Sequence, residues 1–123
     1  PKAPGMKYTH YAPLAPMQLF EGEYPRMVDF MLKKIEMALK DGQTVGAIVS
    51  SETVSKLPSQ VLSVVYGSRY QVAEIAGNLY TALRSFDETN VDIIFTEGIA
   101  EEGLGLAVMN RLRKASGYQI IKS

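Results

Sequence analysis

Four side chains near the start of the chain could bind a charged ligand together. Lys7 and His10 supply hydrogen-bond donors, and Tyr8 and Tyr11 supply aromatic rings beside them. Donors and rings at this density suit a loop segment that covers a phosphate or nucleotide. The alternative is a rigid spacer whose tyrosines only pack on the domain beneath it.

Prolines predict the backbone of this segment. Four of them fall within the first sixteen residues, where they remove amide donors and keep the preceding residues out of the helical region. We therefore expect residues 1–16 to form an extended interdomain linker and residues 17–123 to form the folded domain. In polyproline geometry, at ~3.1 Å per residue, the linker spans on the order of 40 Å, enough to cross a neighbouring domain.

A second candidate site follows a predicted strand in the middle of the chain. Gly67, Ser68 and Arg69 would place free helix amides and a guanidinium together, which suits an anion. The stretch from Ser68 to Gln71 also has the form of a capping box that starts a helix. In that alternative Gly67 makes the turn, Ser68 caps the helix and Arg69 is solvated, so that no ligand is needed.

The segment GLGLAV, residues 103–108, has part of a dinucleotide-binding fingerprint. Val108 stands where the third glycine is required, and the segment lies late in the chain instead of after the first strand. We therefore interpret it as the start of a helix. Three basic residues in the last turns of that helix are expected to be solvated and to complement its dipole: Arg111, Arg113 and Lys114.

Composition excludes several classes of site. The 123 residues include 13 basic and 13 acidic ones, no cysteine and one histidine. The charge balance gives no reason to expect direct binding of nucleic acid or of an anionic membrane. Thiolate and multi-histidine metal sites are impossible, and no apolar run approaches the ~20 residues of a membrane span. Together with the absence of a signal-peptide pattern, this predicts a cytoplasmic protein without a metal site.

Hydrophobic periodicity places the candidate sites on a predicted sheet. Apolar runs predict strands at residues 17–21, 44–50, 61–67, 91–97 and 118–122, and helical spacing is found at residues 24–40, 72–86 and 103–115. Strands that alternate with helices and lack polar alternation are typical of a parallel sheet covered on both faces. We predict the α/β class, as a three-layer, Rossmann-like, doubly wound parallel sheet of five strands in the order 2-1-3-4-5. Its ligand crevice would lie between the loops after strands one and three.

Three stretches of the chain resemble a known family, the two-domain threonylcarbamoyl-AMP synthases: PGMKYTHYAPLAP, NLYTALRSFDETNVDIIFTEG and EGLGLAVMNRLRKASG. Shorter relatives of these two-domain enzymes consist of the YrdC-like domain alone. The resemblance implies that this chain is the linker and the Rossmann-like C-terminal domain of such an enzyme. It implies that the linker covers the catalytic cavity, with matching residues at Pro4, Gly5, Met6, Lys7, Tyr8, His10, Tyr11 and Pro13, and with Ala12 also matching.

The resemblance also implies an activity for the complete protein. The N-terminal YrdC-like domain makes threonylcarbamoyl-AMP from L-threonine, bicarbonate and ATP, with magnesium, for threonylcarbamoyladenosine in tRNA. It is a nucleotidyltransferase whose catalytic residues would lie before Pro1, so we expect this chain to have none, to bind no cofactor and to be inactive alone. Its partners would be that domain, the substrates through it, and tRNA only indirectly. The alternatives are a free-standing nucleotide- or anion-binding module and a purely structural domain.

Overall fold

A computed structural model describes residues 12–123 as a five-stranded sheet with helices on both faces. The strands are β1 (Met17–Glu21), β2 (Val45–Ser50), β3 (Leu62–Gly67), β4 (Ile93–Glu97) and β5 (Ile120–Lys122). The helices are α2 (Arg26–Lys40), α3 (Val72–Arg84) and α4 (Leu104–Ala115), and a 3-10 turn, η1 (Val54–Lys56), joins β2 to β3.

The strands are all parallel and lie in the order β3-β2-β4-β1-β5. The predicted α/β class and doubly wound parallel sheet are confirmed. If β2, β3, β4, β1 and β5 are numbered one to five, the observed order reads 2-1-3-4-5, which is the predicted layout. The first strand of the chain, β1, however, occupies the fourth place in the sheet, between β4 and β5. This corrects the predicted place of residues 17–21, since apolar periodicity identifies a strand but not its neighbours. The reversal of strand order therefore involves β2, β3 and β4.

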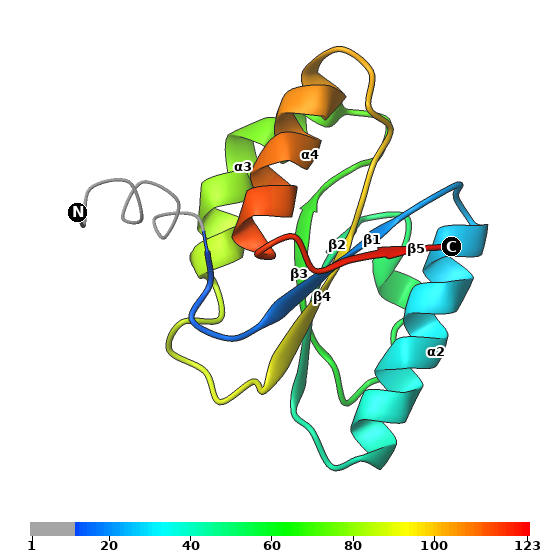
Figure 1. The fold of residues 1–123 in the computed structure, drawn as a ribbon, viewed down its shortest axis with the longest axis vertical. Helices are drawn as coiled ribbons and strands as arrows, with labels where there is room; N and C mark the ends of the chain where they lie inside the picture. Colours follow the sequence, from blue (N-terminus) through cyan, green and yellow to red (C-terminus); the bar gives the residue numbers. More distant parts are fainter. Residues whose placement is uncertain (1–11) are drawn as a thin grey trace.

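Two helices cover one face of the sheet and one covers the other. Figure 1 shows α3 and α4 side by side on one face and α2 on the opposite face. The chain runs from β1 through β2 to β3 in one direction across the sheet and then returns through β4 to β5. Right-handed crossovers require connections in opposite directions to lie on opposite faces. The handedness rule thus accounts for the helix layers.

Each face of the sheet has its own hydrophobic core, which explains the lack of polar alternation in the strands. Leu19 packs with the α3 and α4 side chains, whereas its neighbour Phe20 packs with those of α2. Both are fully buried, because successive side chains of a strand point to opposite faces. Phe20 also meets Phe95 of β4 edge to face, with ring centroids 5.7 Å apart.

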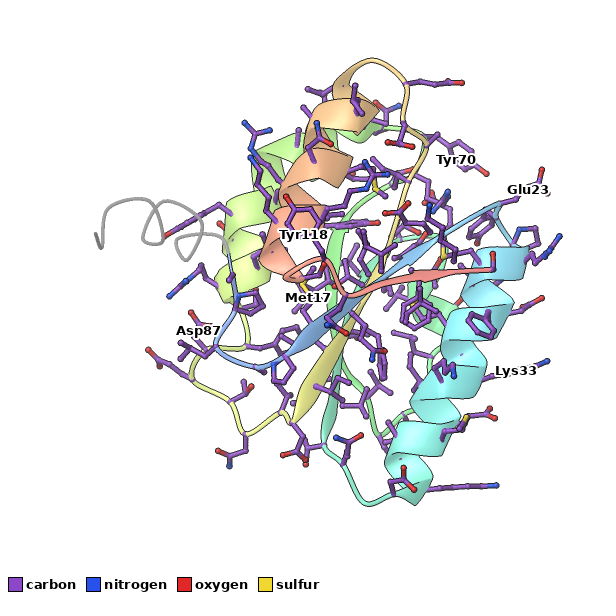
Figure 2. The ribbon with its side chains drawn as sticks, in the orientation of Figure 1. Met17, Glu23, Lys33, Tyr70, Asp87 and Tyr118 are labelled. Atoms are coloured by element: carbon purple, nitrogen blue, oxygen red, sulfur yellow. The ribbon has the colours of Figure 1, made fainter. Side chains whose placement is uncertain are left out.

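The helix α2 shows the expected amphipathic pattern. Its buried residues recur at helical spacing, as at Met27, Met31 and Ile35. Figure 2 shows Lys33 pointing away from the sheet on this helix. The figure also shows Glu23 and Tyr70 towards the edge where the strands end, whereas Asp87 lies at the opposite edge. The strand ends therefore gather their polar loops along one edge.

Candidate functional site

The most extensive polar cluster of the described residues lies where β2, β3 and β4 end. Ser50, Gly67 and Glu97 are the last residues of these three strands, and parallel strands bring their carboxyl ends to one edge of a sheet. Glu97 is completely buried there. Because an ionised carboxylate is costly to bury without partners, the donors around Glu97 determine what this edge can do.

Glu97 is held by donors from two neighbouring segments. The Arg69 guanidinium forms an ion pair with it, with 2.6 Å between Nη1 and Oε2. The backbone N–H of Ser50 donates to Oε1 at 2.8 Å, and the Ser50 hydroxyl lies 2.9 Å from Oε2. The Thr53 hydroxyl lies 3.2 Å from that of Ser50. The carboxylate is therefore fully engaged within the chain.

Arg69 has further partners on both sides of the ion pair. Its Nη1 also donates to the backbone carbonyl of Gly98 at 2.9 Å, and its guanidinium carbon lies 4.4 Å from the centroid of the Tyr24 ring. A guanidinium over an aromatic face gains a cation–π interaction. The side chain is only 12% exposed. The expectation that Arg69 is solvated if it binds no ligand is therefore wrong, because its guanidinium is paired with the buried carboxylate of Glu97.

A buried tyrosine, Tyr66, also contributes a hydrogen bond at this edge of the sheet. The Tyr66 hydroxyl donates to the backbone carbonyl of Glu97, and the residue is completely buried. Burial raises the pKa of Tyr66 well above its ordinary value, and the Glu97 charge adds to this effect. Tyr66 therefore acts as a neutral hydrogen-bond donor and not as an acid at neutral pH.

The turn at the predicted anion site is occupied by two glutamates of the chain. Glu52 accepts from the Ser68 hydroxyl at 2.6 Å and from the Arg69 backbone N–H at 2.8 Å. The Ser68 backbone N–H donates to Glu74 at 2.8 Å. The hydrogen bond from Ser68, followed by that from Arg69, lowers the pKa of Glu52 below its ordinary value. The donors of this turn thus already have carboxylate partners within the chain, and an anion site at Gly67, Ser68 and Arg69 stays a prediction.

The capping box predicted at this turn is wrong. The helix begins at Val72, and the residue before it, Gln71, makes no side-chain cap. The Ser68 hydroxyl accepts instead from the Tyr70 backbone N–H at 3.1 Å, which closes a local serine turn. Glu74 supplies the carboxylate that reaches back to this turn. The helix therefore starts at Val72, four residues after Ser68, because Glu52 and Glu74 stabilise a separate turn at Ser68 ahead of it.

A second ion-pair cluster lies at the end of β1. Arg113 donates to Glu21 through Nε at 2.8 Å and through Nη2 at 3.1 Å, and its Nη1 lies 2.7 Å from Glu101. The hydrogen bonds to the two glutamates raise the pKa of Arg113, and that from Arg113 lowers the pKa of Glu101. The expectation that Arg113 is solvated is wrong, since this side chain is 19% exposed. It fastens α4 to the end of β1.

At the opposite edge of the sheet the chain enters the domain beside α3. Arg84 Nη1 donates to the Ala12 carbonyl at 3.3 Å, and the Leu14 backbone N–H donates to Asp87 at 3.2 Å. Arg84 and Asp87 are joined by an ion pair of 2.7 Å, and we call them the entry clamp. The predicted site residue Pro13 is buried between these contacts.

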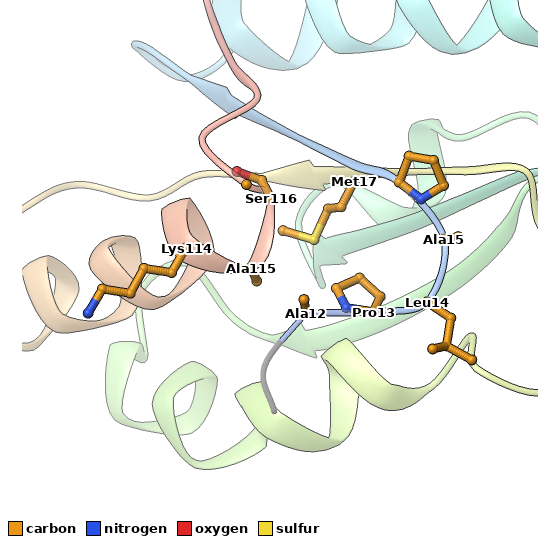
Figure 3. A pocket seen from close by; sticks show the side chains of 10 residues that line it. Ala12, Pro13, Leu14, Ala15, Met17, Lys114, Ala115 and Ser116 are labelled. Atoms are coloured by element: carbon orange, nitrogen blue, oxygen red, sulfur yellow. The ribbon is translucent and has the colours of Figure 1, made fainter. Parts of the chain in front are cut away.

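The entry segment also borders a pocket of about 450 Å³. Figure 3 shows the pocket between residues 12–17 and the end of α4 at Lys114, Ala115 and Ser116. Residues 12–16 thus lie against the folded domain. The other predicted linker residues lie outside the described part of the chain: Pro4, Gly5, Met6, Lys7, Tyr8, His10 and Tyr11. Their role in covering a substrate stays a prediction.

Within residues 12–123 no group of three or more acidic or histidine side chains could hold a metal ion. In the same part of the chain, no helix combines the length and the apolar character of a membrane span.

The acidic residues at the strand ends are paired with arginines, as in Glu97 with Arg69 and Glu21 with Arg113. The ion pairs of this edge therefore hold loops and strands together. The sequence does not predict these pairs, because partners so distant along the chain form no local pattern.

Comparisons with known proteins agree with the fold and identify the family. The model of the family described as threonylcarbamoyl-AMP synthase, C-terminal domain, matches residues 1–117. The chain is 50% identical to the threonylcarbamoyl-AMP synthase of Pyrococcus abyssi, over 98% of this chain and 34% of that protein. It is 40% identical to the Bacillus subtilis enzyme of the same name, over 99% of this chain and 34% of that protein. The chain therefore spans about a third of the length of these curated relatives.

Two solved structures have the same fold. The Pyrococcus abyssi Sua5 complexed with L-threonine superposes with a TM-score of 0.81 at 43% identity, covering 92% of this chain and 31% of that one. The C-terminal Sua5 domain from Pyrococcus horikoshii superposes with a TM-score of 0.70 at 36% identity, covering 91% of this chain and 100% of that one. In the second structure the domain stands alone as a folded chain. Sequence and fold agree that this chain belongs to the family of threonylcarbamoyl-AMP synthase C-terminal domains.

Proposed function

We propose that the chain is the C-terminal part of an enzyme that makes threonylcarbamoyl-AMP from L-threonine, bicarbonate and ATP for the modification of tRNA. ATP, magnesium and the catalytic residues belong to a preceding YrdC-like domain. The folded domain holds residues 1–16 at their C-terminal end, and this linker covers the catalytic cavity. The chain alone is then inactive, and its contact with tRNA is indirect.

The family match over residues 1–117 carries the proposed activity, and the entry clamp supports the proposed role of the linker. Arg84 and Asp87 bind the backbone at Ala12 and Leu14, so the C-terminal end of the linker has a fixed origin on the domain. Loop segments that close over an active site exclude water and complete the binding of the substrate. Lys7 and His10 would face phosphate or carboxylate groups, and the tyrosines would shield the labile intermediate from water.

The test uses the full-length enzyme with Lys7→Ala and Tyr8→Ala combined. We expect synthesis of threonylcarbamoyl-AMP to fall about tenfold or more, because misplaced covering groups cost orders of magnitude in rate. The melting temperature should change little. The matched control combines Lys33→Ala with Tyr70→Ala, which removes one exposed lysine and one tyrosine that is 74% exposed. Equal kinetics for the double variant and the wild type would contradict a covering role.

The alternative is an anion- or nucleotide-binding module at Gly67, Ser68 and Arg69. Its donors already have carboxylate partners in Glu52, Glu74 and Glu97. We therefore expect calorimetric titration of the chain with ATP, AMP and phosphate to give no submillimolar binding. Binding that Arg69→Ala abolishes would favour the module instead.

A further inference from the structure

The two edge strands of the sheet differ in how well they are protected against pairing with another chain. At one edge, β5 is three residues long and ends with Lys122. At the other edge, β3 is six residues long, LSVVYG, and contains neither a charge nor a proline. Short edge strands and charged side chains oppose pairing with a further strand, whereas an apolar edge strand without them permits it. The edge at β3 is therefore the unprotected one.

Both faces of β3 expose apolar side chains. Leu62 is 46% exposed and Val65 is 43% exposed. These two residues are three positions apart, so their side chains point to opposite faces of the sheet. Exposed apolar side chains that adjoin one another mark an interaction surface. The edge is thus apolar above and below the plane of the sheet.

The backbone of β3 indicates where a further strand can bind. An edge strand has one row of N–H and C=O groups that points away from its neighbour, here β2. The Tyr66 carbonyl accepts from the Asn78 side chain of α3 at 3.1 Å, whereas the Gly67 carbonyl accepts from the segment after β2. Backbone groups alternate in direction along a strand. Leu62 and Val64 therefore turn their N–H and C=O groups to the open side, as Tyr66 does.

Helix α3 leaves room for a neighbour beside this edge. A depression of about 270 Å³ is lined by two residues of β3 and by four on the side of α3: Val64, Val65, Asn78, Thr81, Ala82 and Ser85. The last four are short and uncharged, and their spacing places them on one face of the helix. A further strand can therefore approach β3 without meeting a long or charged side chain from these residues.

We propose that a second copy of this chain binds at this edge, with the two β3 strands antiparallel about a two-fold axis. Such an interface brings a surface against itself, so a charge within it would lie near a like charge. The residues of β3 and of the depression carry none. The same lack of charge gives no electrostatic selection for a different partner.

The open backbone groups determine the register of the two strands. With the two-fold axis at Ser63, Leu62 of each copy lies opposite Val64 of the other. Residues opposite each other with their backbone groups turned inward exchange two hydrogen bonds. Each copy therefore supplies the strand that the other lacks, and the two sheets become one continuous sheet.

The experiment measures the oligomeric state of the 123-residue chain by sedimentation equilibrium over a range of concentrations. We expect a reversible dimer. Leu62→Lys should raise its dissociation constant about tenfold or more, because a lysine on an edge strand opposes pairing. The control is Met37→Lys, which changes a 57% exposed side chain on α2 and should leave the constant unchanged. A monomer at every concentration, or equal constants for the two variants, would overturn the proposal.

Cross-linking tests the register. The sequence has no cysteine, so a single introduced thiol reports on its own position. Ser63→Cys should form a disulfide between copies on air oxidation, because a non-hydrogen-bonded antiparallel pair places Cα atoms ~4.5 Å apart, within disulfide range. Met37→Cys should not. Equal cross-linking of the two variants, or cross-linking of Met37→Cys alone, would show that the copies meet at another surface.

A second substitution removes the dependence on Leu62→Lys. Circular dichroism checks that every variant folds, and Val65→Lys places the new charge on the opposite face of the same strand. It should weaken the dimer in the same way, and a dimer unaffected by it would contradict the pairing. None of these measurements involves a substrate, so their results do not depend on the proposed enzymatic activity.

Discussion

The guanidinium of Arg69 and the carboxylate of Glu97 form a buried ion pair that spans three strands. Arg69 follows β3 and Glu97 ends β4, and β2 lies between these two strands in the sheet. Ser50, at the end of β2, donates to the same carboxylate. One acidic side chain thus fixes the relative positions of three loops at the carboxyl edge, which stabilises the end of the domain opposite the entry clamp.

The first prediction concerns this ion pair. Arg69→Ala should lower the free energy of unfolding by about 3–5 kcal/mol, because it leaves the Glu97 charge buried without its cationic partner. The measurement is urea unfolding of the chain alone. Combining Arg69→Ala with Glu97→Gln should restore part of the loss, since a neutral amide costs less to bury. A double variant that is no more stable than the additive sum of the single changes predicts would argue against direct coupling.

The second prediction compares two buried threonines. The Thr96 hydroxyl has no hydrogen-bond partner among the described residues, whereas the Thr53 hydroxyl lies 3.2 Å from that of Ser50. Thr96→Val should therefore be neutral or stabilise the fold by about 1 kcal/mol, while Thr53→Val should destabilise it by about as much. Thermal unfolding of both variants measures the difference. A larger loss for Thr96→Val than for Thr53→Val would contradict the hydrogen-bond assignment.

The third prediction concerns two glycines in helices. A side chain at Gly105 would overlap with the backbone carbonyl of Ala100, whereas nothing lies within 4 Å of one at Gly77. Gly105→Ala should therefore destabilise the chain by about 1–3 kcal/mol through overpacking. Gly77→Ala should stabilise it by about 0.5–1 kcal/mol through helix propensity. Denaturant midpoints of the chain alone should move in opposite directions, and a shared direction would refute the packing argument.

The fourth prediction concerns acid stability. Hydrogen bonds from Ser68 and Arg69 lower the pKa of Glu52 in the folded chain, so the ionised form favours folding. This contribution is present above the unfolded pKa of about 4.3 and is lost as the pH falls through the lower folded pKa. The stability difference between the wild type and Glu52→Gln should therefore be larger at pH 7 than at pH 3. A pH-independent difference in urea midpoints would show that the ionised carboxylate has no such role.

The sequence predicts the elements of this fold more completely than their contacts. Leu19 and Phe20 form part of a continuous apolar run that correctly predicts a strand buried on both faces. The place of that strand between β4 and β5 depends on packing between segments more than seventy residues apart. Periodicity within one segment carries no information about such pairing, so the place of the first strand could not be read from it.

The candidate site shows the same limit at the level of single residues. The sequence places this turn at the edge of the sheet, because Gly67 ends the apolar run of β3 and Ser68 and Arg69 follow it. It does not reveal that Arg69 pairs with Glu97, which is 28 residues away, or that Glu52 occupies the amides. These pairs depend on the three-dimensional order of the strands, which no local pattern contains.

The central claim is that the folded domain serves the preceding catalytic domain by holding the linker. Its most direct measurement is the rate of threonylcarbamoyl-AMP synthesis by the full-length enzyme ended after Pro16, which keeps the linker and removes residues 17–123. We expect a large loss of synthesis, and neither added L-threonine nor added ATP should restore the rate. Synthesis at the full-length rate in the shortened enzyme would contradict the account, because the domain and its entry clamp would then be dispensable for the chemistry.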